Sequence, residues 1–317
     1  MPHVRIVHRT EYRYNSPVGL LSHRLMLRPQ DSHDLRLRDA MLAVDPPPAS
    51  TRWAHDVFGN SICLLEWPAD LRTDYLHITS SLELTHYPSG RALKQATLEP
   101  SAETFPFSYD TEEVPDLARL SERHLPDPDR LVDAWARRFV GGGEPISTLA
   151  MLEAMTLAIQ QEFSYSARHA EGTQTPVETL ALGSGTCRDF ALLMMEALRS
   201  HGLAARFVTG YLYDDSASRG RGGGSTHGWC AVYLPGAGWV EYDPTNGLMA
   251  GRNLLRIAVT RTPEQATPIC GGFLGERGAF AGMSVDVQVS LVQPEEPREA
   301  PMPQPVSVAA SEPVLAP

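Results

Sequence analysis

The residues with the clearest chemical potential surround Cys187. A Gly-x-Gly-x approach precedes this cysteine, and the periodic apolar residues after it predict a helix that ends at Gly202. Ser184 or Thr186 can cap that helix. Cys187 therefore falls in or beside the first turn, where free backbone N–H groups and the positive end of the helix dipole favour an anion.

A cysteine in that position can act as a nucleophile. A thiolate held there has a lowered pKa, and the same free N–H groups can bind an oxyanion that forms beside the sulfur. The alternative is that Cys187 is a small buried hydrophobic residue, as free cysteines often are. Asp189 follows in the same turn, where its charge suits the helix dipole without any catalytic role.

A predicted hairpin supplies the partners that a nucleophilic cysteine needs. Residues 226–234 and 239–242 alternate as strands, and residues 235–238 form the turn. His227 is the candidate base and Asp243 the candidate group that orients the imidazole. The two side chains share a sheet face only if an odd number of unpaired residues joins the strands, and a three-residue loop at 236–238 meets this condition. Glu241 lies on the face of Asp243 and is the rival orienting group.

Ordinary structural roles remain open for several of these residues. A histidine at a strand start is often structural, and an aspartate before a proline can simply begin a turn. Cys230 points away from His227 and is expected in the core. An oxyanion hole needs a second donor besides the Cys187 N–H, and its candidates are Tyr165, Ser184 and the indole of Trp229.

Composition limits the class of protein. The chain has 317 residues, which is about two domains at roughly 150 residues each. Its net charge of −11 disfavours a general nucleic-acid binder, which needs a basic surface. The four cysteines form no C-x-x-C pair, so the sequence supports neither a structural zinc site nor a disulfide scaffold, and no cofactor or metal is expected.

The chain divides into three predicted regions. Residues 1–108 contain short alternating runs separated by turn signals, which predicts an N-terminal antiparallel β-sandwich. Residues 109–292 begin with helices, the clearest of which starts after Ser147, and form the catalytic core. Residues 293–317 are rich in proline and alanine without periodicity, which predicts a disordered tail. The predicted fold class is α+β.

The sequence also favours one compartment. The first residues are charged and lack the apolar region of a signal peptide. No run approaches the roughly 18 apolar residues that span a bilayer. We therefore expect a cytoplasmic protein with reduced thiols and no membrane contact, and the sequence leaves its oligomeric state open.

Taken together, the motifs resemble the transglutaminase-like cysteine peptidase superfamily. The similarity lies in the segments GSGTCRDFA, GLAARFVTGY, HGW and GWVEYDPTN, and in the order Cys, His, Asp. The N-terminal part resembles the β domain of a bacterial branch through the segments YRYNSPV and RLMLRP. The resemblance implies a papain-like α+β core with the Cys-bearing helix packed on an antiparallel sheet. It also implies Cys187 as nucleophile, His227 as base and Asp243 as orienting group.

The sequence departs from the bacterial pattern after Asn246. Related proteins often carry a Gly-Arg-Asp-Tyr segment there, whereas residues 260–266 of this chain read TRTPEQA. If this segment walls the substrate cleft, the usual substrate need not be shared.

Residue types leave more than one reaction open. A Cys–His–Asp site attacks a carbonyl to form a thioester, which water hydrolyses or an amine converts to an amide. Hydrolysis in a peptide or protein substrate is the first expectation, because water is abundant and the sequence shows no amine channel. Acyl transfer to an amine is the second, and a catalytically silent scaffold that binds peptides or partner proteins is an alternative of another class. A disulfide reductase is weakest, for want of a resolving cysteine.

The glycine-rich residues 214–225 come directly before the hairpin that carries His227. Their composition predicts mobility, and we hypothesise that they gate the cleft beside the imidazole. A long connection without function is the alternative.

Overall fold

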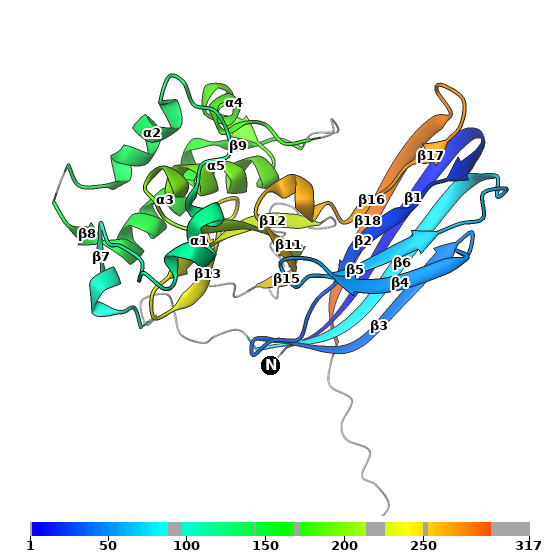
Figure 1. Cartoon of the computed structure of the whole chain (residues 1–317), viewed down its shortest axis with the longest axis horizontal. Coiled ribbons are helices and arrows are strands. Elements are labelled where there is room, and N and C mark those ends of the chain that lie inside the picture. The colour runs from blue at the N-terminus through cyan, green and yellow to red at the C-terminus, as the bar shows by residue number, and fades with distance from the viewer. Residues whose placement is uncertain are drawn as a thin grey trace, which may run out of the picture.

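The computed structural model describes residues 2–87, 97–142, 144–167, 172–213, 226–249 and 253–292. Figure 1 shows two domains side by side, a β-sandwich that holds the N-terminus and a domain in which helices pack on a sheet. The expected α+β class is confirmed. No helix within the described ranges is long and apolar enough to cross a bilayer.

Two antiparallel sheets form the sandwich. In the first sheet, the 18-residue strand β1 (His3–Leu20) pairs with β6 (Thr73–His86), and β6 pairs with β3 (Leu35–Asp45). The second sheet has the order β16 (Ile269–Cys270), β2 (His23–Arg28), β5 (Ser61–Glu66), β4 (Ser50–His55). Alternate residues of β1 face inward, as the period of two predicts. The space between the sheets is filled by a buried apolar cluster that includes Val18, Leu25, Leu65, Leu76 and Ile78.

The end of the chain completes this sandwich. Strand β18 (Phe280–Val292) pairs with β1 along most of its length, and β17 (Phe273–Leu274) pairs with the end of β1. Strand β16 pairs with β2. The predicted division, which placed residues 109–292 in one core, therefore differs from the strand pairing, because the last strands return to the N-terminal sheets. The predicted tail, residues 293–317, lies outside the described residues.

The second domain contains a five-stranded antiparallel sheet. Its order is β14 (Leu248–Met249), β13 (Gly238–Asp243), β12 (His227–Leu234), β11 (Ala205–Leu212), β15 (Leu254–Thr260). The helices are α1 (Val114–Ser121), α2 (Leu131–Ala136), α3 (Thr148–Glu162), α4 (Pro176–Leu182) and α5 (Cys187–Ser200). The strand pairs β7 (Thr104–Phe105) with β8 (Ile146–Ser147) and β9 (Ser164–Tyr165) with β10 (Ser184–Gly185) connect them. Short 3₁₀ turns lie at η2 (Pro100–Ala102), η3 (Arg137–Phe139) and η4 (Pro263–Ala266).

Helix α5 is the centre of this domain. Nearly all of its residues are buried, and one apolar cluster joins it to α3 and to the facing side of the sheet. The helix ends as predicted, because Gly202 has a φ of +78° and Leu203 N–H donates to Leu198 C=O at 3.1 Å. The cap predicted for α3 is also present, since the hydroxyl of Ser147 accepts from the N–H of Ala150.

The long first sheet also contacts the second domain. At the far end of β1 from the sandwich core, Val4 and Ile6 share a buried cluster with Tyr211 and Ile257. There His8 Nδ1 lies 2.7 Å from the hydroxyl of Tyr211. One sheet therefore packs against a second sheet at one end and against the helix-bearing domain at the other.

Candidate functional site

Cys187 is the first residue of α5. Thr186 caps the helix with an extended backbone, and its hydroxyl accepts from the N–H of Asp189. Cys187 is 8% exposed, so the residue is largely covered by its neighbours. Cys187 lies in the first turn, as predicted, at the end of the helix that carries free N–H groups and the positive end of the dipole.

Asp189 completes the helix cap. Its Oδ2 accepts from the N–H of Thr186 at 2.7 Å and from the Thr186 hydroxyl at 2.9 Å. Its Oδ1 accepts from the N–H of Gln174 at 2.7 Å. The carboxylate is fully buried by these contacts, so it fixes the approach to Cys187 and agrees with the structural role predicted for it.

The β12–β13 hairpin has the odd loop that the site requires. Leu234 pairs with Gly238, which leaves three unpaired residues, 235–237, one position earlier than the loop expected at 236–238. With this register, His227 and Asp243 project from the same face of the sheet. Nε2 of His227 and Oδ2 of Asp243 lie 2.8 Å apart, and both side chains are buried.

Asp243 is held by more than the histidine. Its Oδ2 also accepts from Asn246 Nδ2 at 2.8 Å, and its Oδ1 accepts from the N–H of Thr245 at 3.0 Å. The rival orienting group, Glu241, instead pairs with Arg256 at 2.5 Å. The structure therefore brings Asp243, and not Glu241, to the imidazole.

The second ring nitrogen of His227, Nδ1, is the one available to the thiol of Cys187. Nδ1 of His227 is buried and makes no full hydrogen bond within the described residues, although the ring interacts with the Cys187 sulfur. The backbone N–H of Gly228 also contacts that sulfur. A Cβ added to Gly228 would lie 2.8 Å from the Phe207 ring and 3.4 Å from Arg188 Cγ, so glycine is needed for this close approach.

Electrostatics favour the charged forms of all three groups. Burial raises the pKa of Cys187, but His227, the N–H of Gly228 and the charge of Arg188 outweigh burial and lower it. Burial lowers the pKa of His227, but Asp243 and the thiol outweigh burial and raise it to about 10. Burial raises the pKa of Asp243, and its contacts with His227 and Asn246 lower it in turn. The arrangement therefore favours a thiolate beside an imidazolium.

The three candidates for a second oxyanion donor lie at different places. Tyr165 on β9 pairs with Gly185 on β10, and the charge of Cys187 helps raise the pKa of its hydroxyl, after the larger effect of burial. Ser184 lies one residue earlier on β10, paired with Ser164. The Trp229 indole stacks on the His227 ring at 5.9 Å, fully buried, and its Nε1 has no partner among the described residues.

The segment that departs from the bacterial pattern borders the site. Arg188, next to Cys187, donates to the carbonyls of Pro263 at 3.3 Å and Ala266 at 3.2 Å. These two residues bound the 3₁₀ turn η4, which leads back to the N-terminal domain at β16. The segment 260–266 therefore fixes the first turn of α5 from the side.

Other predictions concern the remaining cysteines and the loop. Cys230 lies in the core on the opposite face from His227, as expected, and burial raises the pKa of its thiol. Cys63 is buried in the sandwich and Cys270 is exposed. Within the described ranges no group of three or more metal-binding side chains lies together. The predicted gating loop, residues 214–225, lies outside the described residues.

Sequence reasoning missed Gly228, Asn246 and Arg188. Each has a signal in hindsight, because all three sit within three residues of a predicted catalytic position. Their roles depend on contacts with other elements, which residue type and periodicity do not report.

Comparisons with known proteins agree with this architecture. The model of the bacterial transglutaminase-like N-terminal region matches residues 4–85, and that of the transglutaminase-like superfamily matches residues 133–244. An uncharacterised protein of Mycobacterium tuberculosis is 28% identical over 296 residues, which span 89% of this chain and 91% of that protein. An uncharacterised protein of Mycobacterium leprae is 25% identical over 297 residues, which span 92% and 98%.

A solved structure shares the fold. It is a protein from Cytophaga hutchinsonii whose name assigns it provisionally to the cysteine proteases. The two chains are 18% identical with a TM-score of 0.65, and the match covers 93% of this chain and 92% of the other. Residues 133–244 thus form a core of the transglutaminase-like superfamily, and the bacterial transglutaminase-like N-terminal region precedes it at residues 4–85.

Proposed function

We propose that this protein hydrolyses a peptide or amide bond through a thioester formed on Cys187. In this proposal His227 is the base and Asp243 orients it. The observation that carries the proposal is the buried His227–Asp243 contact of 2.8 Å, with the opposite ring nitrogen left for the thiol. A cysteine nucleophile needs this chain of three groups, because the imidazole must keep one tautomer and one orientation.

The reaction proceeds in two balanced steps. The thiolate of Cys187 attacks the scissile carbonyl, and the imidazolium of His227 gives its proton to the departing amine as the C–N bond breaks. Water then adds to the thioester with His227 as general base, which leaves the ring protonated, and the C–S bond breaks to release a carboxylic acid and restore the thiolate–imidazolium pair. Asp243 keeps its charge throughout and stabilises the imidazolium.

The oxyanion of each tetrahedral intermediate needs donors aimed at it. The N–H of Cys187 at the helix start is the first in this proposal. Tyr165 is the best supported of the three candidates for the second donor, because the charge of Cys187 contributes to the raised pKa of its hydroxyl. Ser184 and the Trp229 indole remain candidates, although the indole lies beneath the imidazole and fully buried.

The substrate class follows from the reaction and the charge of the chain. A peptide or protein substrate supplies the carbonyl, and a net charge of −11 gives no attraction for nucleic acid. Acyl transfer to an amine uses the same thioester and is the alternative activity. A silent scaffold that binds peptides or partner proteins is the alternative without chemistry.

An acyl-trapping experiment separates these possibilities. The intact protein and Cys187→Ser are incubated with an activated ester, and the acyl adduct is located by peptide mass mapping. We expect an adduct on Cys187 that decays to free acid at a rate that added methylamine changes little. Conversion mainly to the methylamide would instead support acyl transfer. Absence of any adduct on Cys187 would favour the scaffold.

A further inference from the structure

A turn of the N-terminal domain forms hydrogen bonds with β15, the edge strand of the sheet that carries His227 and Asp243. This turn, residues 56–60, joins β4 to β5. Its Asn60 is 5% exposed and holds the backbone of Val259 on β15, with Nδ2 donating to the carbonyl at 2.7 Å and Oδ1 accepting from the N–H at 2.9 Å. The side-chain amide therefore satisfies the outer edge of β15 as a neighbouring strand would.

Val259 begins a row of side chains that crosses the sheet to the candidate site. Val259 pairs with Val208 on β11, and Val208 pairs with Trp229 on β12. Continuing the β12–β13 register by one step sets Asp243 opposite Trp229. Because directly paired residues share a sheet face, this row runs from the domain contact to the carboxylate that holds His227.

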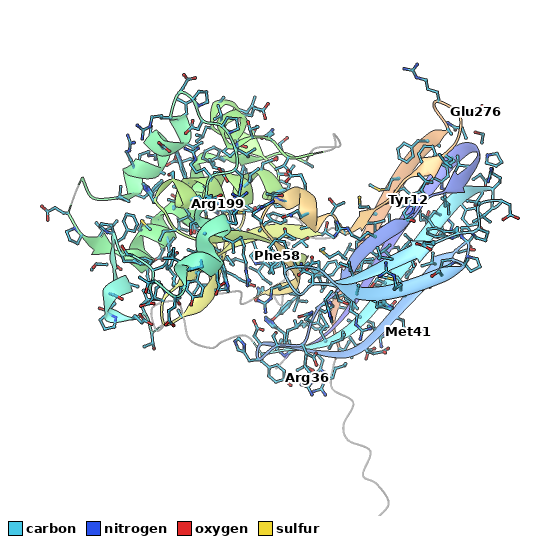
Figure 2. All side chains as sticks on the ribbon, viewed as in Figure 1. Tyr12, Arg36, Met41, Phe58, Arg199 and Glu276 are labelled. Atoms are coloured by element: carbon cyan, nitrogen blue, oxygen red, sulfur yellow. The ribbon has the colours of Figure 1, made fainter. Side chains whose placement is uncertain are left out.

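Phe58 of the same turn lies against the apolar cluster to which three residues of this row, Val259, Val208 and Trp229, belong. It packs against the cluster of Val208, Trp229, Ala231, Leu254 and Val259. Figure 2 shows Phe58 at the junction of the two domains, beside β15.

The indole of Trp229 is confined on its other sides. Its ring stacks on the His227 imidazole with an angle of 27° between the ring planes. An added Cβ at Gly210 would lie 2.8 Å from the indole Cη2, so the neighbouring strand leaves no free space there. A displacement of the indole therefore has to move the imidazole with it.

The turn is held in shape by its own first residue. Oδ1 of Asp56 accepts from the N–H groups of Phe58 at 2.9 Å and of Asn60 at 2.8 Å. Its Oδ2 accepts from Asn60 Nδ2 at 2.8 Å. Val57 lies in the same turn but is 92% exposed, which makes it a matched control.

We infer that the turn 56–60 positions the catalytic histidine through Trp229, so that the N-terminal domain is part of the catalytic unit. Phe58 and Asn60 are positioning residues, because neither contacts the reacting atoms. The inference rests on the proposed function, since it gives the turn a role in orienting the base. A base held slightly out of place loses much of its effect, because catalysis depends on near-ångström geometry.

The test compares Phe58→Ala, Phe58→Leu and Val57→Ala in the full chain. The rate of Cys187 modification by iodoacetamide is measured against pH, and thermal unfolding shows which variants are folded. We expect Phe58→Ala to slow modification at pH 6 on the order of 10-fold and to shift the profile to higher pH. The rate for Phe58→Leu should lie between those of the wild type and Phe58→Ala, and the rate for Val57→Ala should match that of the wild type. If Phe58→Ala does not fold, Phe58→Leu supplies the comparison.

A second measurement asks whether Phe58 acts through the indole. In a Trp229→Ala background, Phe58→Ala should cause little further slowing, because the connecting ring is already gone. Equal slowing in both backgrounds would overturn the inference, as would a wild-type profile in a folded Phe58→Ala. If Cys187 of the wild type does not react at low pH, the proposed function and this inference are both overturned. A wild-type profile in the variant, with that reactivity intact, would overturn only the role of the turn.

Discussion

Replacing Asp243 by asparagine should uncouple the thiol from the imidazole. The carboxylate accepts from His227, Asn246 and the N–H of Thr245 through both oxygens, whereas an amide has one accepting oxygen. If the amide oxygen keeps His227, the NH₂ group faces the N–H of Thr245. If the NH₂ group faces His227, the ring must adopt the wrong tautomer. Asp243→Asn therefore loses either the hydrogen bond from the N–H of Thr245 or the correct tautomer of His227, whichever rotamer the amide adopts.

The loss of charge sets the magnitude. A 2.8 Å contact between Oδ2 and Nε2 puts the charge centres roughly 4 Å apart, which is about 4 kcal/mol at an effective dielectric constant near 20. That energy is about three pKa units, in line with a His227 pKa raised from 6.5 to about 10. Without the carboxylate, burial is left to lower the pKa of His227. The equilibrium between the ion pair and the neutral pair should then fall about 10³-fold.

Thiolate absorbance titrated against pH measures this change, with Cys187→Ser as the blank. The wild-type thiolate should persist well below pH 7, whereas in Asp243→Asn it should appear only as the pH approaches about 8 or above. Glu241→Gln is the matched control, because Glu241 lies on the same strand and face but pairs with Arg256. A titration of Asp243→Asn that matches the wild type, in a folded protein, would refute the role given to the carboxylate.

Three further changes have expected outcomes. Thr186→Ala removes the hydroxyl cap of α5 and should lower the free energy of unfolding in urea by about 1 kcal/mol; no change would show that Asp189 alone caps the helix. Gly228→Ala places a Cβ 2.8 Å from Phe207 and should slow Cys187 alkylation, and an unchanged rate would contradict the need for close approach. Burial lowers the pKa of His8 to about 4 in the folded protein. The neutral ring therefore costs no stability above pH 6.5, and the free energy of unfolding falls as the pH drops from 6.5 toward 4. His8→Gln should reduce this fall in the free energy of unfolding by about 3 kcal/mol. An equal fall with pH in both proteins, measured by urea unfolding at each pH, would contradict it.

Local features of the sequence predicted the parts of the site that local forces build. The cap at Thr186, the end of the helix at Gly202 and the faces of the hairpin depend on residues within a few positions of one another. The requirement for an odd loop followed from the period of two alone. Its placement was wrong by one residue, because Gly238 pairs with Leu234 instead of remaining in the turn.

Long-range contacts were beyond sequence reasoning. The pairing of β18 with β1 joins residues at opposite ends of the chain, and an alternating strand carries no mark of its partner. For the same reason no pattern in the sequence marks Asn60, although its amide holds a strand about two hundred residues away. The choice between Asp243 and Glu241 also required the structure, since only the position of Arg256 separates them.

In the proposed function, Cys187 and His227 form a thiolate–imidazolium pair in the resting protein. The most direct test is the rate of iodoacetamide modification of Cys187 against pH, read by peptide mass mapping in the wild type and in His227→Ala. The exposed Cys270 in the same digest serves as the reference for reagent activity. We expect rapid modification of Cys187 well below pH 7 that His227→Ala abolishes. Modification of Cys187 with the profile of an ordinary thiol of pKa about 8.5 in both proteins would contradict it.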